Sequence, residues 1–277
     1  MRPEVSRRSA ALGGGGMAGA LAAGVGVLAA QAVAARRAIG PQRVVPPYQD
    51  GRFGPRTGMS IRLAVLGDSV AAGLGADTAA DTVAGVLVRG VNEASGRPVT
   101  VHNHAVVGAR SADLALQVTR CLTARPHVAV IIIGANDVTH LVPRAAAARR
   151  LEKQVHRLVD SGTAVIVGTC PDLGTVRPVG PPLRWVARER SRSLARAQRR
   201  VTTRAGGTPV NLYDLLGPEF AANAEALFGP DLFHPSSLGY RRIGSALLPA
   251  VLASLGLAPT RPRPELTAAP ASVGSTE

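Results

Sequence analysis

Short apolar segments alternate with helical segments along most of the chain, and this alternation limits the folds that it can adopt. Segments rich in Val, Ile, Leu and Ala are predicted as strands at Ile61–Leu66, Val99–His104, Val128–Ile133, Ala164–Gly168 and Pro209–Leu212. Helical patterns lie near Thr78–Glu93, Ser111–Leu122, Arg144–Asp160, Leu183–Thr203 and Leu238–Leu255. Such alternation produces right-handed crossovers and a parallel sheet that is covered on both faces. We therefore predict an α/β fold, a three-layer α/β/α sandwich with a five-stranded parallel sheet of the flavodoxin-like type.

The two cysteines place few constraints on this fold. Cys121 is expected at the end of a helix and Cys170 just past the end of a strand, on opposite edges of the sheet. A disulfide requires Cα atoms within about 7 Å, so we expect two thiols that are not bridged to each other. The cysteines also lack the spacing of a metal site.

The chain is strongly basic, with a net charge of +14 that rests almost wholly on arginine, because Lys153 is its one lysine. Such a charge indicates contact with anionic surfaces such as phospholipid or nucleic acid, although arginine bias is also typical of a high-GC genome. Nucleic acid is disfavoured as a partner because aromatic residues make up 3% of the chain and no binding module is present. The arginine-rich helix Leu183–Thr203 is either a solvated face or a contact for anionic lipid.

The amino-terminal region contains an uncharged segment, Ala10–Ala35, with a pair of arginines on either side. Because about 20 apolar residues span a bilayer, we predict a transmembrane anchor here. Two alternatives stay open: a cleaved export signal, for which Ala30-Gln31-Ala32 has the form of a cleavage site, and a soluble helix. Ser6-Arg7-Arg8-Ser9 is also a partial twin-arginine signal.

These patterns divide the chain into five parts. A basic amino terminus (1–9) precedes the anchor or signal segment (10–35), and a linker rich in Pro, Gly and Arg follows (36–58). The globular domain (59–257) comes next, and the tail (258–277) is predicted to be disordered. We accordingly predict a protein of the cell membrane with its domain outside the cytoplasm, or one that is exported or associated with the cell envelope.

Ser69 lies where the first predicted strand ends, in the sequence Gly67-Asp68-Ser69-Val70. The carboxyl edge of an open parallel sheet is where such folds bind their ligands. Ser69 can be a nucleophile there if a base, an acid that orients the base and oxyanion donors lie nearby. The alternative interpretation is that Ser69 only caps the following helix.

Loops after the other strands carry suitable partners. Gly108 offers a free backbone N–H before a helix, and Asn136 offers a side-chain amide that can stabilise an oxyanion. Asp231 and His234 stand three residues apart, and Pro235 keeps His234 out of the helical region, so Asp231 can fold back onto Nδ1 and leave Nε2 as a base. Taken singly, these residues are also compatible with turn or helix-cap roles.

Together these motifs resemble the GDSL/SGNH hydrolase family between Ile61 and Leu255. The matching blocks are Gly67-Asp68-Ser69-Val70 (with Val70 in place of the usual Leu), Gly108, Gly134-x-Asn136-Asp137 and Asp231-x-x-His234. The resemblance implies a catalytic triad of Ser69, His234 and Asp231. It also implies an oxyanion hole formed by Ser69, Gly108 and Asn136, an acyl-enzyme intermediate, and no metal or cofactor.

The sequence therefore predicts a serine esterase or lipase that acts on lipid or acetyl esters. An α/β-hydrolase is disfavoured because Gly67-x-Ser69-x-Ala71 lacks the final glycine of the nucleophile elbow. A second hypothesis is a catalytically silent surface protein that uses the same fold to bind a ligand or partner. Asp68 and Asp137 are expected to brace the loops.

Overall fold

The computed structural model describes residues 11–40, 45–47 and 50–258. Its strands are β1 (Gly51–Phe53), β2 (Ile61–Gly67), β3 (Val99–Asn103), β4 (Val128–Ile132), β5 (Ala164–Gly168) and β6 (Thr208–Val210). They form one sheet in the order β1-β3-β2-β4-β5-β6, in which all neighbours are parallel except β1 and β3. The predicted five-stranded parallel sheet is thus confirmed, together with its flavodoxin-like strand order.

The antiparallel edge strand β1 was not predicted. It lies inside the segment 36–58, which we expected to be a linker without regular structure, and it pairs with β3 from Gly51↔Val101 to Phe53↔Val99. β1 has three residues, of which only Phe53 is large and apolar, so it is too short to show the alternation typical of a strand. Its pairing with β3 identifies it as a strand.

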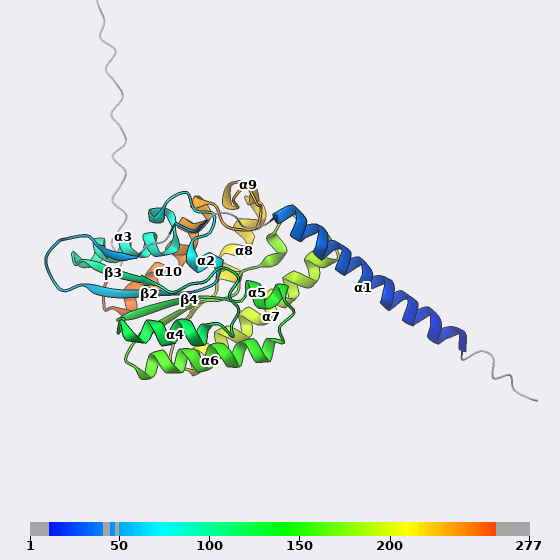
Figure 1. The fold of residues 1–277 in the computed structure, drawn as a ribbon, viewed down its shortest axis with the longest axis horizontal. Coiled ribbons are helices and arrows are strands. Elements are labelled where there is room, and N and C mark those ends of the chain that lie inside the picture. The colour runs from blue at the N-terminus through cyan, green and yellow to red at the C-terminus, as the bar shows by residue number, and fades with distance from the viewer. Residues whose placement is uncertain (1–10, 41–44, 48–49, 259–277) are drawn as a thin grey trace, which may run out of the picture.

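Helices cover both faces of the sheet. They are α2 (Ser69–Ala72), α3 (Val83–Ser95), α4 (Leu114–Thr123), α5 (Ala135–Thr139), α6 (Arg144–Asp160), α7 (Leu183–Arg204), α8 (Leu212–Ala222), α9 (Ala224–Leu227) and α10 (Ser237–Ser254). Short 3₁₀ helices, η1 (Ala79–Asp81) and η2 (Leu173–Thr175), add to these. Helices α3 and α10 lie on one face, and α4 and α6 lie on the other (Figure 1).

The central strand β4 shows why the sheet forms a core on each side. Val128, Val130 and Ile132 point into one apolar cluster, whereas Ala129 and Ile131 point into the other, and every residue of the strand is buried. A parallel strand with both faces covered requires such a continuous apolar run. Cys170 belongs to the first cluster and Cys121 to the second; both are buried and free, as predicted.

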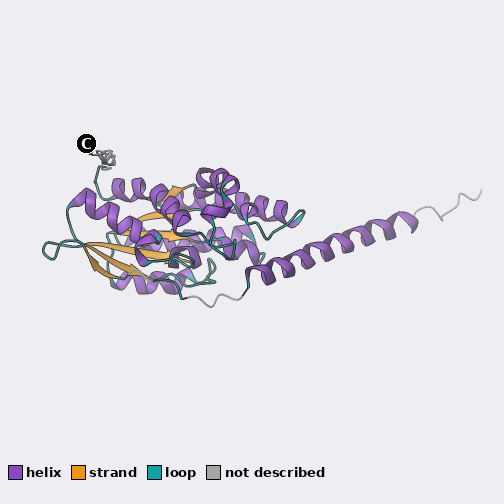
Figure 2. Cartoon of the chain, turned by 90° about the horizontal axis from the view of Figure 1, so that it is seen from above, coloured by secondary structure: helices purple, strands orange, loops and turns teal. Residues whose placement is uncertain are grey.

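The amino-terminal segment is a helix, α1 (Ala11–Ile39), which extends away from the rest of the chain in both views (Figure 1 and Figure 2). Gln31 of this helix contacts the domain: its Nε2 donates to Pro181 O (2.5 Å), and Leu183 N donates to its Oε1 (3.1 Å). Ala35 is buried.

The prediction of a transmembrane anchor at 10–35 is not supported. No helix in the described part of the chain is at once long enough and apolar enough to cross a membrane. An export signal stays a prediction. The basic residues 1–9 and nearly all of the tail 258–277 lie outside the described residues.

Candidate active site

The turn after β2 presents Ser69 at the carboxyl edge of the sheet. Gly67 has φ +138°, and a Cβ at this position would lie 1.8 Å from Ile132 O, so only glycine fits beside β4. The Gln117 side chain binds both polar groups of Gly67: Gly67 N–H donates to Oε1 (2.8 Å), and Nε2 donates to Gly67 O (2.9 Å). This clamp fixes the end of the strand immediately before Ser69.

Asp68, not Ser69, caps the short helix α2. Val70 N–H donates to Asp68 Oδ1 (3.0 Å), and Ser69 is the first helical residue. Ser69 is buried, with 6% of its surface exposed. Its hydroxyl is therefore free of the capping role that the alternative interpretation gave it.

Ser69, His234 and Asp231 form a continuous hydrogen-bonded chain. His234 Nε2 lies 3.0 Å from Ser69 Oγ, and His234 Nδ1 lies 2.6 Å from Asp231 Oδ2. Asp231 Oδ1 also accepts the backbone N–H groups of Phe233 and His234, both at 2.9 Å. Leu232, at φ +54°, turns the backbone so that the carboxylate folds back in this way. The contact expected from the three-residue spacing is present.

The hydrogen bonds to Asp231 keep its carboxylate ionised. Partial burial of Asp231 raises its pKa, but hydrogen bonds from the His234 side chain and from two backbone N–H groups outweigh this and lower it to about 2. An ionised Asp231 accepts Nδ1–H of His234, which leaves Nε2 with a lone pair toward the Ser69 hydroxyl.

The other two predicted residues follow the strands next to β2: Gly108 comes after β3 and Asn136 after β4. Asn136, on α5, lines the same pocket as Ser69 and His234, and its Nδ2 donates to Ala109 O (3.1 Å). This contact joins Asn136 to the loop of Gly108, which is exposed and has φ +82°. Within the described residues, the backbone N–H groups of Ser69 and Gly108 have no hydrogen-bond acceptor.

Asp68 and Asp137 brace these loops, as expected. The Asp137 carboxylate accepts Ser111 N–H (3.0 Å) and Ser111 Oγ–H (2.8 Å), which holds the start of the segment before α4. Burial raises the pKa of Asp137. Burial also raises the pKa of Asp68 to about 7, against the lowering effect of the Val70 N–H and with a smaller contribution from nearby Asp137.

The raised pKa of Asp68 predicts a pH dependence of stability. Because the folded protein holds this proton more tightly than the unfolded chain, the stabilisation is complete below pH 3.8 and is lost as the pH rises through about 7. The change corresponds to about 4 kcal/mol. Between pH 4 and pH 8, the unfolding free energy of wild type is therefore expected to fall by about this amount relative to Asp68→Asn in urea denaturation. If the unfolding free energies of wild type and Asp68→Asn change in parallel with pH, the raised pKa of Asp68 is contradicted. Asp160→Asn, which changes an exposed carboxylate, is the control.

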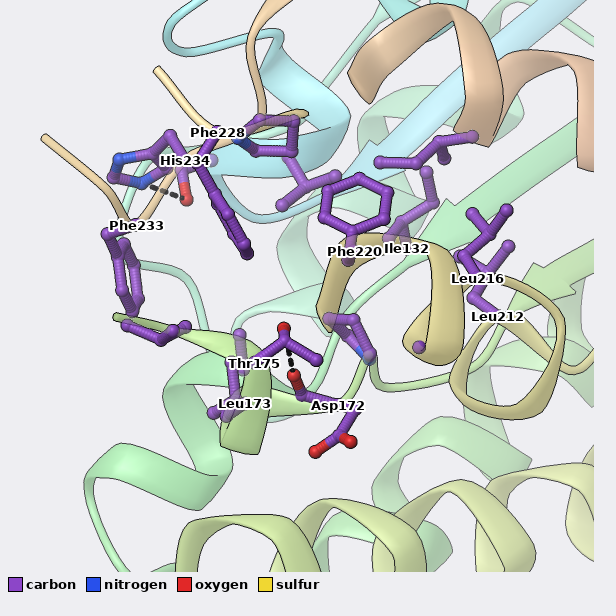
Figure 3. Close-up of a pocket in the computed structure, with 18 of the residues that line it drawn as sticks. Ile132, Asp172, Leu173, Thr175, Leu212, Leu216, Phe220, Phe228, Phe233 and His234 are labelled. Atoms are coloured by element: carbon purple, nitrogen blue, oxygen red, sulfur yellow. Dashed lines mark hydrogen bonds between the residues drawn. The ribbon is translucent and has the colours of Figure 1, made fainter. Parts of the chain in front are cut away.

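An apolar pocket, partly open to solvent, lies beside Ser69 and His234. Its walls come from η2, α8, α10 and the segment before His234 (Figure 3). In this view Leu212 and Leu216 lie on the side away from His234. The Asp172 carboxylate accepts hydrogen bonds from Gly174 N–H (2.8 Å) and from Arg188 Nε (3.1 Å).

This pocket was not predicted from the sequence. Three of the four phenylalanines of the chain line it, at Phe220, Phe228 and Phe233. Their concentration in the fourteen residues 220–233, directly before His234, is the sequence signal that would have indicated it. Gln117 was missed as well, because it lies fifty positions from Gly67. Among the described residues, no group of three or more His, Cys, Asp or Glu side chains has a metal-binding arrangement.

Comparison with known proteins places this geometry in context. Residues 65–242 match the GDSL-like Lipase/Acylhydrolase family. A GDSL-like esterase of Mycobacterium tuberculosis is 40% identical over 227 residues, which cover 77% of this chain and 72% of the relative.

Two solved structures share the fold. A lipase/acylhydrolase from Enterococcus faecalis superimposes with a TM-score of 0.57 at 20% identity, covering 73% of this chain and 100% of that chain. A mutant of an acetylxylan esterase from Geobacillus stearothermophilus gives 0.57 at 17% identity, covering 76% and 100%. At these identities, the two structures support the fold alone.

Proposed function

Because the chain belongs to the GDSL-like lipase/acylhydrolase family and is an esterase, we propose that it hydrolyses carboxylic acyl esters with Ser69, His234 and Asp231 as catalytic triad. The observation that carries this proposal is the hydrogen-bonded chain from Ser69 Oγ through His234 to Asp231. A nucleophile, a base and a group that orients the base are in the order that acyl transfer requires.

The proposed reaction has two steps. Ser69 Oγ attacks the ester carbonyl carbon while His234 Nε2 takes the hydroxyl proton, and Asp231 stabilises the imidazolium. His234 then gives this proton to the oxygen of the leaving alcohol, and an acyl-enzyme on Ser69 remains. A water molecule, deprotonated by His234 Nε2, then attacks the acyl carbon; the bond from this carbon to Ser69 Oγ breaks, His234 returns the proton to Oγ, and the acid is released.

The oxyanion of the tetrahedral intermediate needs donors that are already in place. We assign this role to the backbone N–H groups of Ser69 and Gly108 and to the side-chain amide of Asn136. The free N–H groups support the assignment, as does the hydrogen bond of Asn136 to Ala109, which uses one of two amide hydrogens and leaves the other. Each such donor contributes about 3–4 kcal/mol to the transition state.

We further propose that the apolar pocket binds the acyl chain of the substrate. It adjoins Ser69, and most of its lining is aliphatic or aromatic. Each methylene of an acyl chain that enters it contributes about 0.8 kcal/mol, so the side of the pocket away from His234 selects acyl length. Leu216 lies on that side (Figure 3).

Replacing Leu216 with tryptophan is expected to shorten the acyl chains that the enzyme prefers. The indole ring is larger than the leucine side chain and excludes about three methylenes from the far side of the pocket. The kcat/KM for decanoyl esters should therefore fall about 10–100-fold, whereas that for acetyl esters should stay unchanged. Turnover of p-nitrophenyl esters from two to twelve carbons measures this. Leu215→Trp is the matched control, because Leu215 is the preceding residue of α8, is 58% exposed and does not line the pocket. An identical chain-length profile in both variants would place the acyl chain elsewhere.

A further inference from the structure

A second cavity, of about 270 Å³, lies between α5, α6 and α7. It shares no lining residue with the pocket of Ser69. Its lining includes Val138, Val142, Arg144, Ala145, Arg190 and Ser193. Two arginines and no acidic residue line this cavity, so its charge is positive.

The arginines of this cavity have no counter-charge. Arg144 Nη1 donates to Ser193 Oγ (2.6 Å) and Arg190 Nη2 donates to Val142 O (3.2 Å), but within the described residues neither guanidinium forms an ion pair. The Nε of Arg190 is buried and also lacks an acceptor there. Two other arginines of α7 do form ion pairs: Arg188 with Asp172 and Arg204 with Glu152. A partly buried arginine such as Arg190 is costly without a counter-charge, and a bound anion would supply one.

The amino terminus of α6 faces the same cavity. This helix has 17 residues, begins at Arg144, has Pro143 as N-cap without a side-chain cap, and has no acidic residue in its first turn. In the described part of the chain, the N–H groups of Arg144 and Ala145 have no acceptor. Helix amino termini of this kind attract anions, because free N–H groups and the helix dipole act together.

We propose that this cavity, which we call the α6 site, binds a phosphate-type oxyanion. Three features converge on it: two guanidiniums without counter-charge, free N–H groups at a helix amino terminus, and a cavity, open to solvent, with apolar walls from Val138 and Val142. Guanidinium forks and backbone N–H groups are the donors that phosphoryl oxygens accept. The oxyanion is either free phosphate or the phosphoryl group of a lipid head group.

Binding is tested on the full-length protein with two probes. The first is inorganic phosphate, titrated against thermal unfolding at constant ionic strength, and the second is sedimentation with vesicles of phosphatidic acid, with phosphatidylcholine vesicles as reference. Each probe is applied to wild type, Arg144→Gln, Arg190→Gln and Arg200→Gln. Arg200 is the matched control, since it is an exposed arginine of α7 that does not line the cavity. Far-UV circular dichroism verifies that the variants fold.

A saturable rise in Tm with phosphate is expected in wild type and in Arg200→Gln, with at least a tenfold weaker half-saturation in Arg144→Gln and Arg190→Gln. The same pattern confined to phosphatidic acid vesicles supports the lipid head group as the source. The proposal is overturned if neither probe binds wild type, or if all three variants respond equally, because equal responses indicate the general positive charge of the chain. Since Arg144 is exposed and its variant removes no buried side chain, a failure of Arg190→Gln to fold still leaves a decisive comparison.

Discussion

Replacing Ser69 with alanine is expected to lower kcat for ester hydrolysis by about 10⁶-fold, with little change in KM. The substitution removes the atom that forms the acyl-enzyme and leaves the apolar pocket intact, so substrate binding should persist. His234→Ala should cost about as much, because without a base near Oγ the hydroxyl is a weak nucleophile. The double variant should be no slower than either single variant, since residues that act as one unit are not additive. The assay is p-nitrophenyl butyrate turnover on purified protein.

Asp231 provides the finer test of this arrangement. Asp231→Asn preserves the side-chain shape, but it removes the negative charge that holds Nδ1–H of His234, and a loss of about 10⁴ in kcat is expected. Ser254→Ala, which changes a serine whose Oγ donates to Val251 O at the end of α10, should retain full activity. Wild-type rates in Ser69→Ala would mean that another group is the nucleophile. They would also be the result for a catalytically silent protein that carries a contaminating esterase.

How far the fold was predictable depended on the length of each element. β4 and α6 were placed almost to the residue, because β4 is a continuous run of buried apolar residues and α6 is a 17-residue helix with a clear amphipathic period. β1 was missed, because a three-residue edge strand is defined by its pairing with β3 and has no period of its own. The short helices α8 and α9 were not among the predicted helices.

In the active site, too, local contacts were predictable from the sequence and long-range ones were not. The contact of Asp231 with His234 spans three residues, so local geometry was enough to predict it. The acyl pocket depends on η2, α8 and α10 converging beside Ser69, which only the packing of distant segments determines.

Gly67→Ala is expected to be among the most damaging single substitutions in the chain. The new methyl group would lie 1.8 Å from Ile132 O, a backbone atom of the neighbouring strand, and φ +138° is strained for alanine. The two central strands would have to separate where Asp68 N–H also donates to Ile132 O (3.1 Å). A loss of more than about 4 kcal/mol in unfolding free energy is expected, which is a large share of the stability of a typical domain. Urea denaturation measures it.

Gly96→Ala separates this clash from the cost of backbone strain alone. Gly96 ends α3 at φ +64°, and a Cβ there would have no neighbour within 4 Å, so a loss of roughly 1–2 kcal/mol is expected. The difference between the two variants therefore measures how closely β4 approaches the turn that presents Ser69. If both variants lose the same small amount, the turn has room to move, and the placement of Ser69 beside His234 must then depend on the Gln117 clamp and the Asp68 cap instead.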